Sequence, residues 1–546
     1  MVAELLLEHG VDTVFGYPGG AALNMYDALY KYSGKIHHVL GAHEQHSAHA
    51  ADGYARATGK VGVVMATSGP GACNLVTGIA TAFMDSIPMV AITSNVSSDL
   101  IGRDAFQEIY ITGVTLPITK HNFFVNNIED LPHVIRQAFK IAQSGRKGPV
   151  LVDITKDVTG MSGNFEHQAP YEVVGLPKVE NEDLMEIAAL INKAKQPVIY
   201  YGGGVAASDA GLLLKEFMEK ADVPGAYTIM AAGVLGYKDE KNLGLIGMHG
   251  SSAANKTIDQ ADLVLALGTR FSDRVAQNTK KFCGKATIVQ VDIDRSEINK
   301  NVIVEKSIVC DVKDFLEKIL PLIDKKERKA WFEKINTWKA GAYRPVDDDT
   351  KLKPHQLMDK ICSMTPDDSV YVTDVGQHQM WAAQFIKHVN PKSFITSGGL
   401  GTMGFGYGAS IGAQIACPEK RVIHITGDGS FHMNMNEAAT AVTNKLPIIS
   451  VIFNNKVLGM VYQWQNSFYG GRFSATTVAR ETDYVKVAEG FGAKGYRAST
   501  LAEFEEVFTL ALKEDGPVWI DCTIDKEEKV LPMIPNGGTI DDMIIG

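Results

Sequence analysis

The sequence lacks several features that would place it in other classes of protein. It has only six cysteines in 546 residues, and no two of them stand in a Cys-x-x-Cys spacing. Scattered cysteines of this kind predict reduced thiols in a cytoplasmic protein, and they argue against disulfides and a zinc site. No apolar run approaches the roughly 20 residues that a membrane-spanning helix needs. Residues 1–10 lack the basic and apolar regions typical of a secretory signal.

The chain also lacks a strongly basic segment. Its 63 Asp and Glu residues outnumber its 53 Lys and Arg residues, which gives a formal charge of −10. This balance argues against a nucleic-acid partner, and it is too mild to indicate a disordered acidic tail. The 45% of hydrophobic and 21% of charged residues are globular values, and 546 residues allow roughly three domains.

Short β-branched runs, each followed by a glycine-rich turn and a helical stretch, recur along the chain. Their continuous apolar character is typical of parallel strands that are covered on both faces. Alternation with helices predicts an α/β fold of doubly wound domains with mostly parallel central sheets. The expected strands are 61–67, 149–154, 198–201, 263–267, 288–293, 370–373, 421–426 and 448–454.

Two polar stretches, 160–182 and 325–354, divide the chain. The first combines proline, glycine and mixed charge, and the second is highly charged and ends in a Lys-Pro pair. We expect both to be connections without helices or strands. The three domains that follow are 1–162, 180–325 and 350–546.

The expected strand 421–426 ends in the motif Gly-Asp-Gly-Ser at 427–430. Glycines let a backbone approach a ligand closely. The N–H groups of the following helix, which we expect to begin near Met433, suit a phosphate group. Taken alone, a Gly-Asp turn is common in loops.

The next strand along the chain ends in Asn454-Asn455. Because the carboxyl ends of neighbouring parallel strands lie side by side, these residues should come close to the 427–430 motif. Oxygen ligands suit magnesium. We therefore predict a Mg²⁺ ion held by Asp428, Asn455 and the backbone carbonyl of Val457.

The 427–430 motif and the following Asn pair resemble the signature of thiamine-diphosphate enzymes, which include pyruvate decarboxylases, pyruvate oxidases and acetohydroxyacid synthases. The resemblance extends over the whole chain and implies thiamine diphosphate and Mg²⁺ as cofactors. It also implies a role for each domain. Residues 1–162 would bind the thiamine pyrimidine, 180–325 would be a Rossmann-like FAD-associated domain, and 350–546 would bind the diphosphate and end in an active-site cap.

Glu44 follows a short strand and precedes an alanine-rich helix at 48–58. From the residues alone it is explained as an acidic residue near a helix N-terminus. By resemblance it is the sheltered carboxyl group that hydrogen-bonds the pyrimidine and activates the cofactor. Since Glu44 and Asp428 lie in different domains, the resemblance implies a homodimer or homotetramer with its active site between subunits. His43 and His46 are expected to be structural or solvent-facing rather than metal ligands.

Further segments resemble one of these enzyme groups in particular. They are similar to the catalytic large subunits of acetohydroxyacid synthases, also called acetolactate synthases. These segments are 15–21, 67–72, 104–108, 375–382, 398–404, 459–465 and 532–544. The resemblance implies that Met403 wedges between the two rings of the cofactor, that Trp464 walls the substrate pocket, and that Gln107 lies near the reacting centre. Core packing is the alternative for Met403 and Trp464. The implied thiamine-diphosphate contacts are Glu44, Gly376, Gln377, His378, Gly401, Met403, Gly427, Asp428, Gly429, Ser430, Asn455, Gly459 and Met460.

The strand 198–201 leads into a Gly-x-Gly-x-x-Ala match at 202–207, which by itself is a weak indication of dinucleotide binding. The resemblance implies FAD, although Ser272 stands where the family usually has Asp. Arg274 would also meet the carboxylate of the second keto acid; its alternative is a surface ion pair. The implied FAD contacts are Arg146, Gly202, Gly203, Gly204, Met248, His249, Gly268, Thr269, Arg270, Arg274, Asp292, Ile293 and Asp311.

The resemblance implies that the protein decarboxylates pyruvate and joins the remaining hydroxyethyl group to a second pyruvate or to 2-ketobutyrate. This is the first common step of valine, leucine and isoleucine biosynthesis. The alternatives are a thiamine- and FAD-dependent pyruvate oxidase, a catabolic acetolactate synthase and a non-catalytic nucleotide-binding protein. A small regulatory subunit is a further partner that the sequence leaves open.

Overall fold

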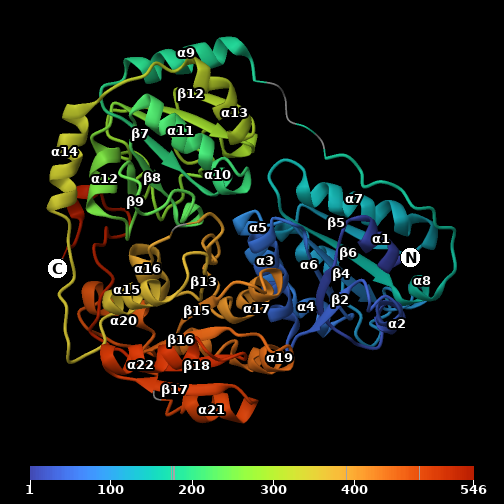
Figure 1. Cartoon of the computed structure of the whole chain (residues 1–546). Helices are drawn as coiled ribbons and strands as arrows, with labels where there is room; N and C mark the ends of the chain where they lie inside the picture. The colour runs from blue at the N-terminus through green and yellow to red at the C-terminus, as the bar shows by residue number, and fades with distance from the viewer. Residues whose placement is uncertain (174, 176–178, 389, 479, 546) are drawn as a thin grey trace. The chain divides into compact units, whose positions relative to one another are not determined.

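The computed structural model describes residues 1–546 except 174, 176–178, 389, 479 and 546. In the described residues, helices alternate with strands, and the strands form three six-stranded sheets on which the helices pack (Figure 1). The pairings recorded between neighbouring strands are parallel. The expected α/β class is therefore confirmed.

The first sheet has the strand order β2-β1-β3-β4-β6-β5. Its strands are β1 Thr13–Tyr17, β2 His37–Leu40, β3 Gly62–Ala66, β4 Met89–Asn95, β5 His121–Val125 and β6 Pro149–Thr155. The α-helices of this part are α1 Val2–Glu8, α2 Leu23–Lys31, α3 Glu44–Thr58, α4 Pro70–Asn74, α5 Val76–Asp85, α6 Ile111–Thr115, α7 Leu131–Gln143 and α8 Lys156–Gly160.

The central sheet has the order β12-β11-β10-β7-β8-β9. Its strands are β7 Pro197–Tyr201, β8 Gly225–Tyr227, β9 Asn242–Leu245, β10 Leu263–Leu267, β11 Thr287–Asp292 and β12 Lys306–Val309. The α-helices here are α9 Asn181–Lys193, α10 Gly203–Ala207, α11 Gly211–Ala221, α12 Ser252–Asp259 and α13 Val312–Ile319. From β7 the next two strands, β8 and β9, are added toward one edge of the sheet, and from β10 the next two, β11 and β12, are added toward the other edge. This is the strand order of dinucleotide-binding folds.

The third sheet has the order β14-β13-β15-β16-β18-β17. Its strands are β13 Val370–Thr373, β14 Phe394–Ile395, β15 Val422–Gly427, β16 Ile449–Asn454, β17 Lys494–Ala498 and β18 Val518–Thr523. The α-helices are α15 Pro354–Met364, α16 Gln377–Phe385, α17 Gly406–Ala416, α18 Asp428–Phe431, α19 Ala438–Thr443, α20 Gly459–Phe468, α21 Tyr484–Phe491 and α22 Leu501–Ala511.

Every strand expected from the sequence is present, with ends that differ by at most one residue. The reason is burial: every residue of β4, β6 and β10 is buried, as covered parallel strands require. In the described part of 161–180 there is no helix or strand, which agrees with the expected connection.

The second expected connection, 325–354, contains a helix, so that expectation was wrong. Helix α14 spans Lys329–Ala340. Trp331, Ile335 and Trp338 lie four and three residues apart and form one apolar stripe. The indole of Trp331 is buried and donates to the carbonyl of Pro197 at 3.0 Å. High charge on the other faces of α14 hid this stripe.

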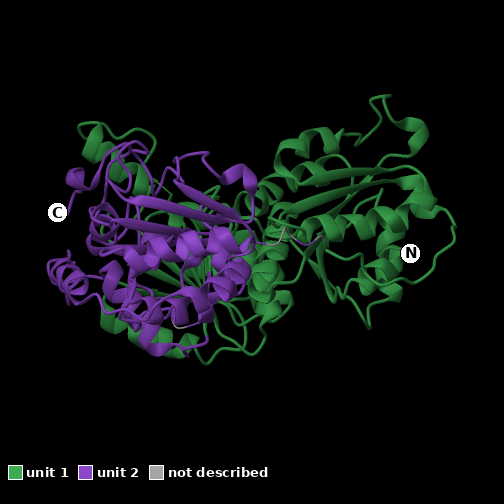
Figure 2. Cartoon of the chain, turned by 90° about the horizontal axis from the view of Figure 1, so that it is seen from above, with its two compact units in different colours: residues 1–174, 369–378, 395–526 green, residues 175–368, 379–394, 527–546 purple. Residues whose placement is uncertain are grey.

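The described residues divide into two compact units (Figure 2). Unit 1 comprises 1–174, 369–378 and 395–526, and it contains the first and third sheets. Unit 2 comprises 175–368, 379–394 and 527–546, so the last residues of the chain belong with the central sheet. The domain boundaries expected from the sequence stay a prediction.

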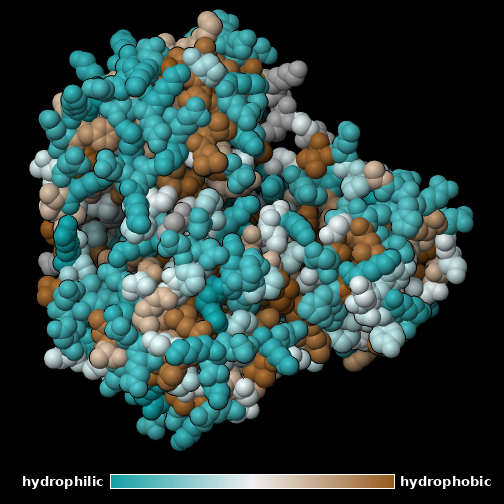
Figure 3. Space-filling model, in the orientation of Figure 1, coloured by the Kyte–Doolittle hydropathy of each residue, from teal (hydrophilic) through white to brown (hydrophobic). Residues whose placement is uncertain are grey.

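Helices α3 and α17 pack closely inside unit 1. A β-carbon on Gly53, Gly408 or Gly412 would overlap backbone atoms of the opposite helix. Glycine at these positions therefore brings the two helix backbones together and joins the first and third sheets in one core. Among the described residues, no helix is long and apolar enough to cross a membrane. The visible surface is mainly hydrophilic with scattered apolar areas (Figure 3).

Candidate active site

The expected ligand-binding loops of the third sheet lie next to each other. Strands β15 and β16 pair in parallel, with Gly427 opposite Phe453, so the residues after each strand meet at one edge of the sheet. The carboxylate of Asp428 accepts a hydrogen bond from the backbone N–H of Lys456. Asn455 Oδ1 accepts from the backbone N–H of Val457 at 3.2 Å. Asp428, Asn455 and Val457 therefore belong to one cluster.

The helix after the Gly-Asp-Gly-Ser motif begins at Asp428 rather than near Met433, so the expected start was too late. Met433 follows this short helix, and the next α-helix, α19, begins at Ala438. The strand thus turns directly into α18, and its first N–H groups come from the motif itself. Such N–H groups at a helix start suit a phosphate.

Asp428 is buried, and burial raises the pKa of its carboxyl group to about 7. A divalent cation beside the carboxylate would offset that cost. Among the described residues, no group of three or more His, Cys, Asp and Glu side chains is placed to hold a metal. The magnesium ligands expected here are one carboxylate, one amide and one backbone carbonyl. This set includes a single acidic side chain, so it does not require a group of three or more such residues.

Glycines and one histidine line the space around these loops, and we call residues 376–378, 427–430 and 455–459 the cradle. A β-carbon on Gly427 would lie 2.7 Å from Nδ1 of His378, and one on Gly429 would lie 2.7 Å from Leu458. A β-carbon on Gly459 would overlap the amide of Gln377. Within the described part of the chain, Nε2 of the buried His378 has no hydrogen-bond partner, and burial lowers the pKa of this imidazole to about 4. The glycines therefore allow the side chains of His378, Leu458 and Gln377 to pack closely, and Nε2 of His378 is left to hydrogen-bond a ligand.

Met403 contacts the cradle, and Trp464 lies on helix α20, which begins at the last cradle residue, Gly459. The methyl group of Met403 would lie 3.9 Å from a β-carbon on Gly429, and the backbone N–H of Gly404 donates to Ser430 Oγ at 3.0 Å. Gly401 and Gly404 both have positive φ, at 69° and 84°. Trp464 lies on α20, is half-buried and meets Phe468 edge to face at 5.4 Å. Met460, on the same helix, is also half-buried.

Glu44 is the first residue of α3, four residues earlier than the helix expected at 48–58. Its Oε2 accepts from the amide of Asn74 at 2.9 Å. A β-carbon on Gly71 would come within 3.2 Å of Oε1, so glycine keeps space open beside this oxygen. Glu44 is half-buried. The imidazole of His43 accepts from Gln45 N–H and caps the helix, and His46 is buried, which agrees with structural roles for both histidines.

Other expected residues gather near Glu44. Gly69 packs against Gln107, because a β-carbon on this glycine would lie 2.8 Å from the Cα of Gln107. Gln107 itself has a φ of 61°, a strained conformation for a residue with a side chain. β-Carbons on Gly19 and Gly71 would both collide with Thr67. Three of the sequence segments singled out in the first domain therefore meet at one place.

A buried carboxylate that the sequence reasoning missed holds the loop before Glu44. Glu437 accepts from the backbone N–H groups of Ala42 at 3.1 Å and His43 at 3.0 Å, and from the hydroxyl of Thr440 at 2.7 Å. Burial raises the pKa of Glu437. A glutamate in a mostly apolar stretch was the one available signal.

A second missed network lies beneath the cradle. Asp374 accepts from the N–H of Gly406 and the hydroxyl of Thr426, both at 2.7 Å, and it meets His424 Nε2 at 3.1 Å. Asn434 also donates to it. Burial alone would raise the pKa of Asp374, but the hydrogen bond and charge of His424 hold it well below its usual range. A histidine inside the apolar strand β15 was the signal.

Most of the expected FAD residues lie in unit 2, at the carboxyl edge of the central sheet. Gly202 and Gly204 press against Gly268: β-carbons on the first two would lie 2.6 Å from backbone atoms of the third. This contact joins the ends of β7 and β10, where the strand order reverses. The N–H of Met248 donates to the carbonyl of Arg274 at 2.8 Å, which brings the 247–249 and 268–274 loops together.

The remaining expected FAD residues vary in their surroundings. Nδ1 of the buried His249 has no hydrogen-bond partner among the described residues. Arg274 is exposed and 3.7 Å from Asp273, as in a surface ion pair. Asp311 caps helix α13 by accepting from Lys313 N–H. Arg146 lies in unit 1 and donates to Ser86 Oγ at 2.8 Å. The other positions are Gly203 at the start of α10, Thr269 and Arg270 after β10, and Asp292 and Ile293 at the end of β11.

Three family models match the chain, and each matches strands of a different sheet. Residues 1–114 match the N-terminal TPP binding domain of thiamine pyrophosphate enzymes, 184–319 match the central domain, and 374–522 match the C-terminal TPP binding domain.

Curated relatives narrow the family. The acetolactate synthase isozyme 3 large subunit of Escherichia coli (strain K12) is 41% identical over 560 residues, covering 100% of this chain and 97% of the relative. The probable acetolactate synthase large subunit of Methanocaldococcus jannaschii is 42% identical, with 100% of this chain and 94% of the relative covered. The acetolactate synthase large subunit of Porphyra purpurea is 42% identical, with 99% and 94% covered. The chain belongs to the acetolactate synthase large-subunit family.

Membership of the acetolactate synthase family agrees with the expectation from the sequence, and the matched segments contain the clusters described above. Glu44 and Gln107 fall in the N-terminal match. Arg274 falls in the central match. The cradle, Met403 and Trp464 fall in the C-terminal match.

Proposed function

We propose that this chain is the catalytic subunit of an acetolactate synthase. It decarboxylates pyruvate and joins the two-carbon remainder to a second pyruvate or to 2-ketobutyrate. The observation that carries this proposal is the meeting of Asp428 with the Asn455–Val457 loop, because helix α20 continues from that loop to Trp464. Identity of about 41% over the full length to acetolactate synthase large subunits supports the same reaction.

The cradle residues are proposed to hold the diphosphate and a Mg²⁺ ion. Asp428, Asn455 and the carbonyl of Val457 would be the magnesium ligands. N–H groups at the start of α18, together with Ser430, would face the diphosphate. Nε2 of His378, which has no hydrogen-bond partner among the described residues, supports this fit because a bound ligand would supply one. Burial of the Asp428 carboxylate supports it because a divalent cation would offset the cost of burying that charge.

Bound thiamine diphosphate supplies a nucleophilic carbon and an electron sink for decarboxylation. Glu44 is proposed to exchange a proton with the pyrimidine ring. Asn74 orients its Oε2 by a hydrogen bond of 2.9 Å, and Gly71 keeps space beside Oε1. Glu437 steadies the backbone just before it. Partial burial shields Glu44 from water, which keeps the proton transfer directed.

Met403 is proposed to contact the cofactor's rings, and Trp464 to form a wall against the second keto acid. The position of Trp464 supports this, because it lies on helix α20, which begins at the cradle residue Gly459, and its side chain is only partly buried. Such a wall is worth about 1–3 kcal/mol per methylene. Trp464→Leu should therefore lower the ratio of acetohydroxybutyrate to acetolactate in mixed keto acids. An unchanged ratio would contradict the wall.

FAD is proposed as a second cofactor on the central sheet. The strand order reverses between β7 and β10, where Gly202, Gly204 and Gly268 meet, and this is where dinucleotides bind in such folds. Arg274 is exposed enough to reach a ligand. Flavin absorbance retained through gel filtration of the purified protein would support the assignment, and colourless protein that takes up no added FAD would contradict it.

The chain is further proposed to act as a homodimer or homotetramer whose active sites lie between copies. Its first domain exposes several large apolar side chains, as an interface requires: Leu100, Ile101, Phe106, Tyr110 and Leu116. Sedimentation would report a dimer or larger species; a monomer would contradict this part. The name "large subunit" among the relatives supports a regulatory partner. The cytoplasmic location stays a prediction.

The proposed activity has a direct test. Purified protein with pyruvate should form acetolactate only when thiamine diphosphate and Mg²⁺ are both present. Oxygen uptake should stay at background, because the reaction transfers no electrons to oxygen. No acetolactate under these conditions, or oxygen consumption in its place, would contradict the proposal.

A further inference from the structure

The segment 396–404, which leads from β14 to α17, ends in Met403 and Gly404. Its far end is fixed to the cradle, because Gly404 N–H donates to Ser430 Oγ at 3.0 Å. Inside the segment, Thr402 N–H donates to Ser397 Oγ at 3.0 Å. The segment therefore forms a tight turn, and its conformation decides where the Met403 side chain points.

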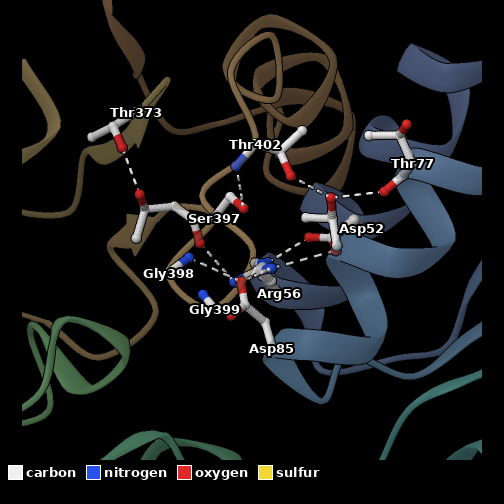
Figure 4. A network of polar contacts seen from close by, with 11 residues as sticks. Asp52, Arg56, Thr77, Asp85, Thr373, Ser397, Gly398, Gly399 and Thr402 are labelled. Carbon is white, nitrogen blue, oxygen red and sulfur yellow. Dashed lines mark hydrogen bonds and ion pairs between the residues drawn. The ribbon is translucent and has the colours of Figure 1, made fainter. Parts of the chain in front are cut away.

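The near end of this segment is held by a carboxylate from the first domain (Figure 4). Asp85, the last residue of α5, accepts the backbone N–H of Gly399 at 2.6 Å through one oxygen and that of Gly398 at 3.1 Å through the other. A β-carbon on Gly399 would lie 2.8 Å from Oδ1 of Asp85, so glycine is needed for this approach. Thr81, one turn earlier on α5, meets the hydroxyl of Thr402 at 2.7 Å.

Arg56 holds Asp85 in turn. Its guanidinium pairs with Asp85 at 2.8 Å, pairs with Asp52, and donates to the carbonyl of Thr396 at 2.9 Å (Figure 4). The side chains of Asp52 and Asp85 are fully buried, and that of Arg56 is 8% exposed. The guanidinium also lies 5.3 Å from the ring centre of Phe405. The network thus touches both sides of the segment.

Burying three charges is a poor way to gain stability, because desolvation offsets most of the attraction between them. Such a network does fix one geometry, since each oxygen of Asp85 is committed to a backbone N–H of the segment. The end of Met403, four residues beyond Gly399, faces Gly429 of the cradle. Resting on the proposed function, we propose that Asp85, oriented by Arg56, is a positioning residue that presents Met403 to the thiamine cofactor.

Asp85→Asn tests this role, because asparagine keeps the volume but cannot accept both N–H groups as a carboxylate does. The measurement is the Kd of thiamine diphosphate at saturating Mg²⁺, followed by calorimetric titration, together with Tm. We expect a rise in Kd of about tenfold, the size of effect that the loss of one charged hydrogen bond gives. The variant Thr81→Val, which removes only the hydroxyl contact to Thr402, should raise Kd by about threefold.

Glu8→Gln is the matched control. Glu8 and Arg136 form a bidentate pair at 2.9 and 3.0 Å, each side chain is 4% exposed, and the pair lies in the same unit between α1 and α7. Its loss should lower Tm as Asp85→Asn does, while Kd stays unchanged. A Kd that rises equally in both variants would show a general loss of structure and overturn the proposal.

A double-variant cycle isolates the route through Met403. Met403→Ala should raise Kd by itself, and adding Asp85→Asn should then raise it little further, because the two changes act through one contact. Independent, multiplying effects would overturn the proposal, and so would a Kd within twofold of wild type for Thr81→Val and for any folded Asp85→Asn. A wild-type protein that binds no thiamine diphosphate would instead overturn the proposed function, so the two failures are distinguishable.

Discussion

The first and third sheets are built on one plan but carry different chemistry. Counted along the chain, both have the strand order 2-1-3-4-6-5. In both, the fourth strand ends in an asparagine that donates to an aspartate on the sixth: Asn95 to Asp153 at 2.6 Å, and Asn454 to Asp521 at 2.9 Å. In the register of the paired strands, Asn95 lies opposite Thr155 and Asn454 lies opposite Thr523.

The difference lies in the residues that follow these strands. When the strand-pairing register is continued past the third strand, Asp428 is level with Asn454, and its counterpart level with Asn95 in the first sheet is Ser68. After the fourth strand, the first sheet has Val96 where the third has Asn455. Two substitutions at one sheet edge thus separate a proposed magnesium site from a plain turn. The first sheet contributes Glu44 instead, at the start of α3. One scaffold therefore serves two roles, and its loops decide which.

The largest effect should come from Asp428→Asn, which makes the third sheet more like the first. Loss of the carboxylate should raise the Kd of thiamine diphosphate in the presence of Mg²⁺ by about 100-fold or more, because the metal loses its one charged protein ligand. Calorimetric titration measures this, and acetolactate formation should fall in parallel. Asp153→Asn, a buried carboxylate of the twin sheet, is the control and should bind as wild type does. If the Asp428→Asn variant bound thiamine diphosphate as tightly as wild type does, the proposed difference between the two sheets would be wrong.

Glu44→Gln should separate turnover from binding. The amide cannot transfer the proton, so acetolactate formation should fall by about 10²–10⁴-fold. The Kd of thiamine diphosphate should change little, since the diphosphate contacts belong to the other sheet. The two numbers come from steady-state assay and titration of the same preparation. Activity near that of wild type would end the activating role of Glu44.

Gly412→Ala should loosen the packing between the two sheets. A β-carbon there would overlap the carbonyl of Ala50 and lie 2.8 Å from the backbone nitrogen of Tyr54. Because both are helix backbone, α3 and α17 must separate, and we expect a loss of about 2–4 kcal/mol in the free energy of unfolding. Chemical denaturation measures it. Gly490→Ala on α21, where a β-carbon meets nothing within 4 Å, should be neutral or slightly stabilising.

The smallest effect concerns Asp153, whose pKa burial raises to about 6 from 3.8. The folded state then binds this proton more readily than the unfolded state, so stability falls as pH rises from about 4 to about 6. Asp153→Asn should lack that fall, so its stability relative to wild type should rise by up to about 3 kcal/mol between pH 4 and pH 7.5. Denaturation curves at pH 4, 5, 6 and 7.5 would show the gap opening. A gap that does not depend on pH would contradict this.

The sequence predicted local structure well and spatial arrangement less well. The strand ends were correct to one residue, because buried parallel strands leave continuous apolar runs. The helix in 325–354 was missed because charge on its exposed faces masked Trp331 and Ile335. The start of α18 at Asp428 was missed because Gly429 is a poor helix former, and the close approach of the Leu458 side chain that favours glycine there is set by tertiary structure.

For the candidate site as well, some residues could be placed together from the sequence and others could not. The 427–430 motif and Asn455 could be placed together because neighbouring parallel strands must meet. Asp374, Glu437 and the Arg56–Asp85 pair could not, since each joins segments that are far apart in the sequence. The shared strand order of the two sheets is also invisible as a sequence repeat, because packing constrains only hydrophobic pattern and turn positions.

We propose that the first and third sheets supply complementary halves of one thiamine site, contributed by different copies of the chain. Mixing Asp428→Asn with Glu44→Gln tests it most directly, because a mixed dimer contains one site with both native residues. Co-expressed variants, each inactive alone, should recover acetolactate formation to about a quarter of the wild-type rate if chains pair at random. Activity that stays at the level of the separate variants in a proven mixed dimer would contradict the claim.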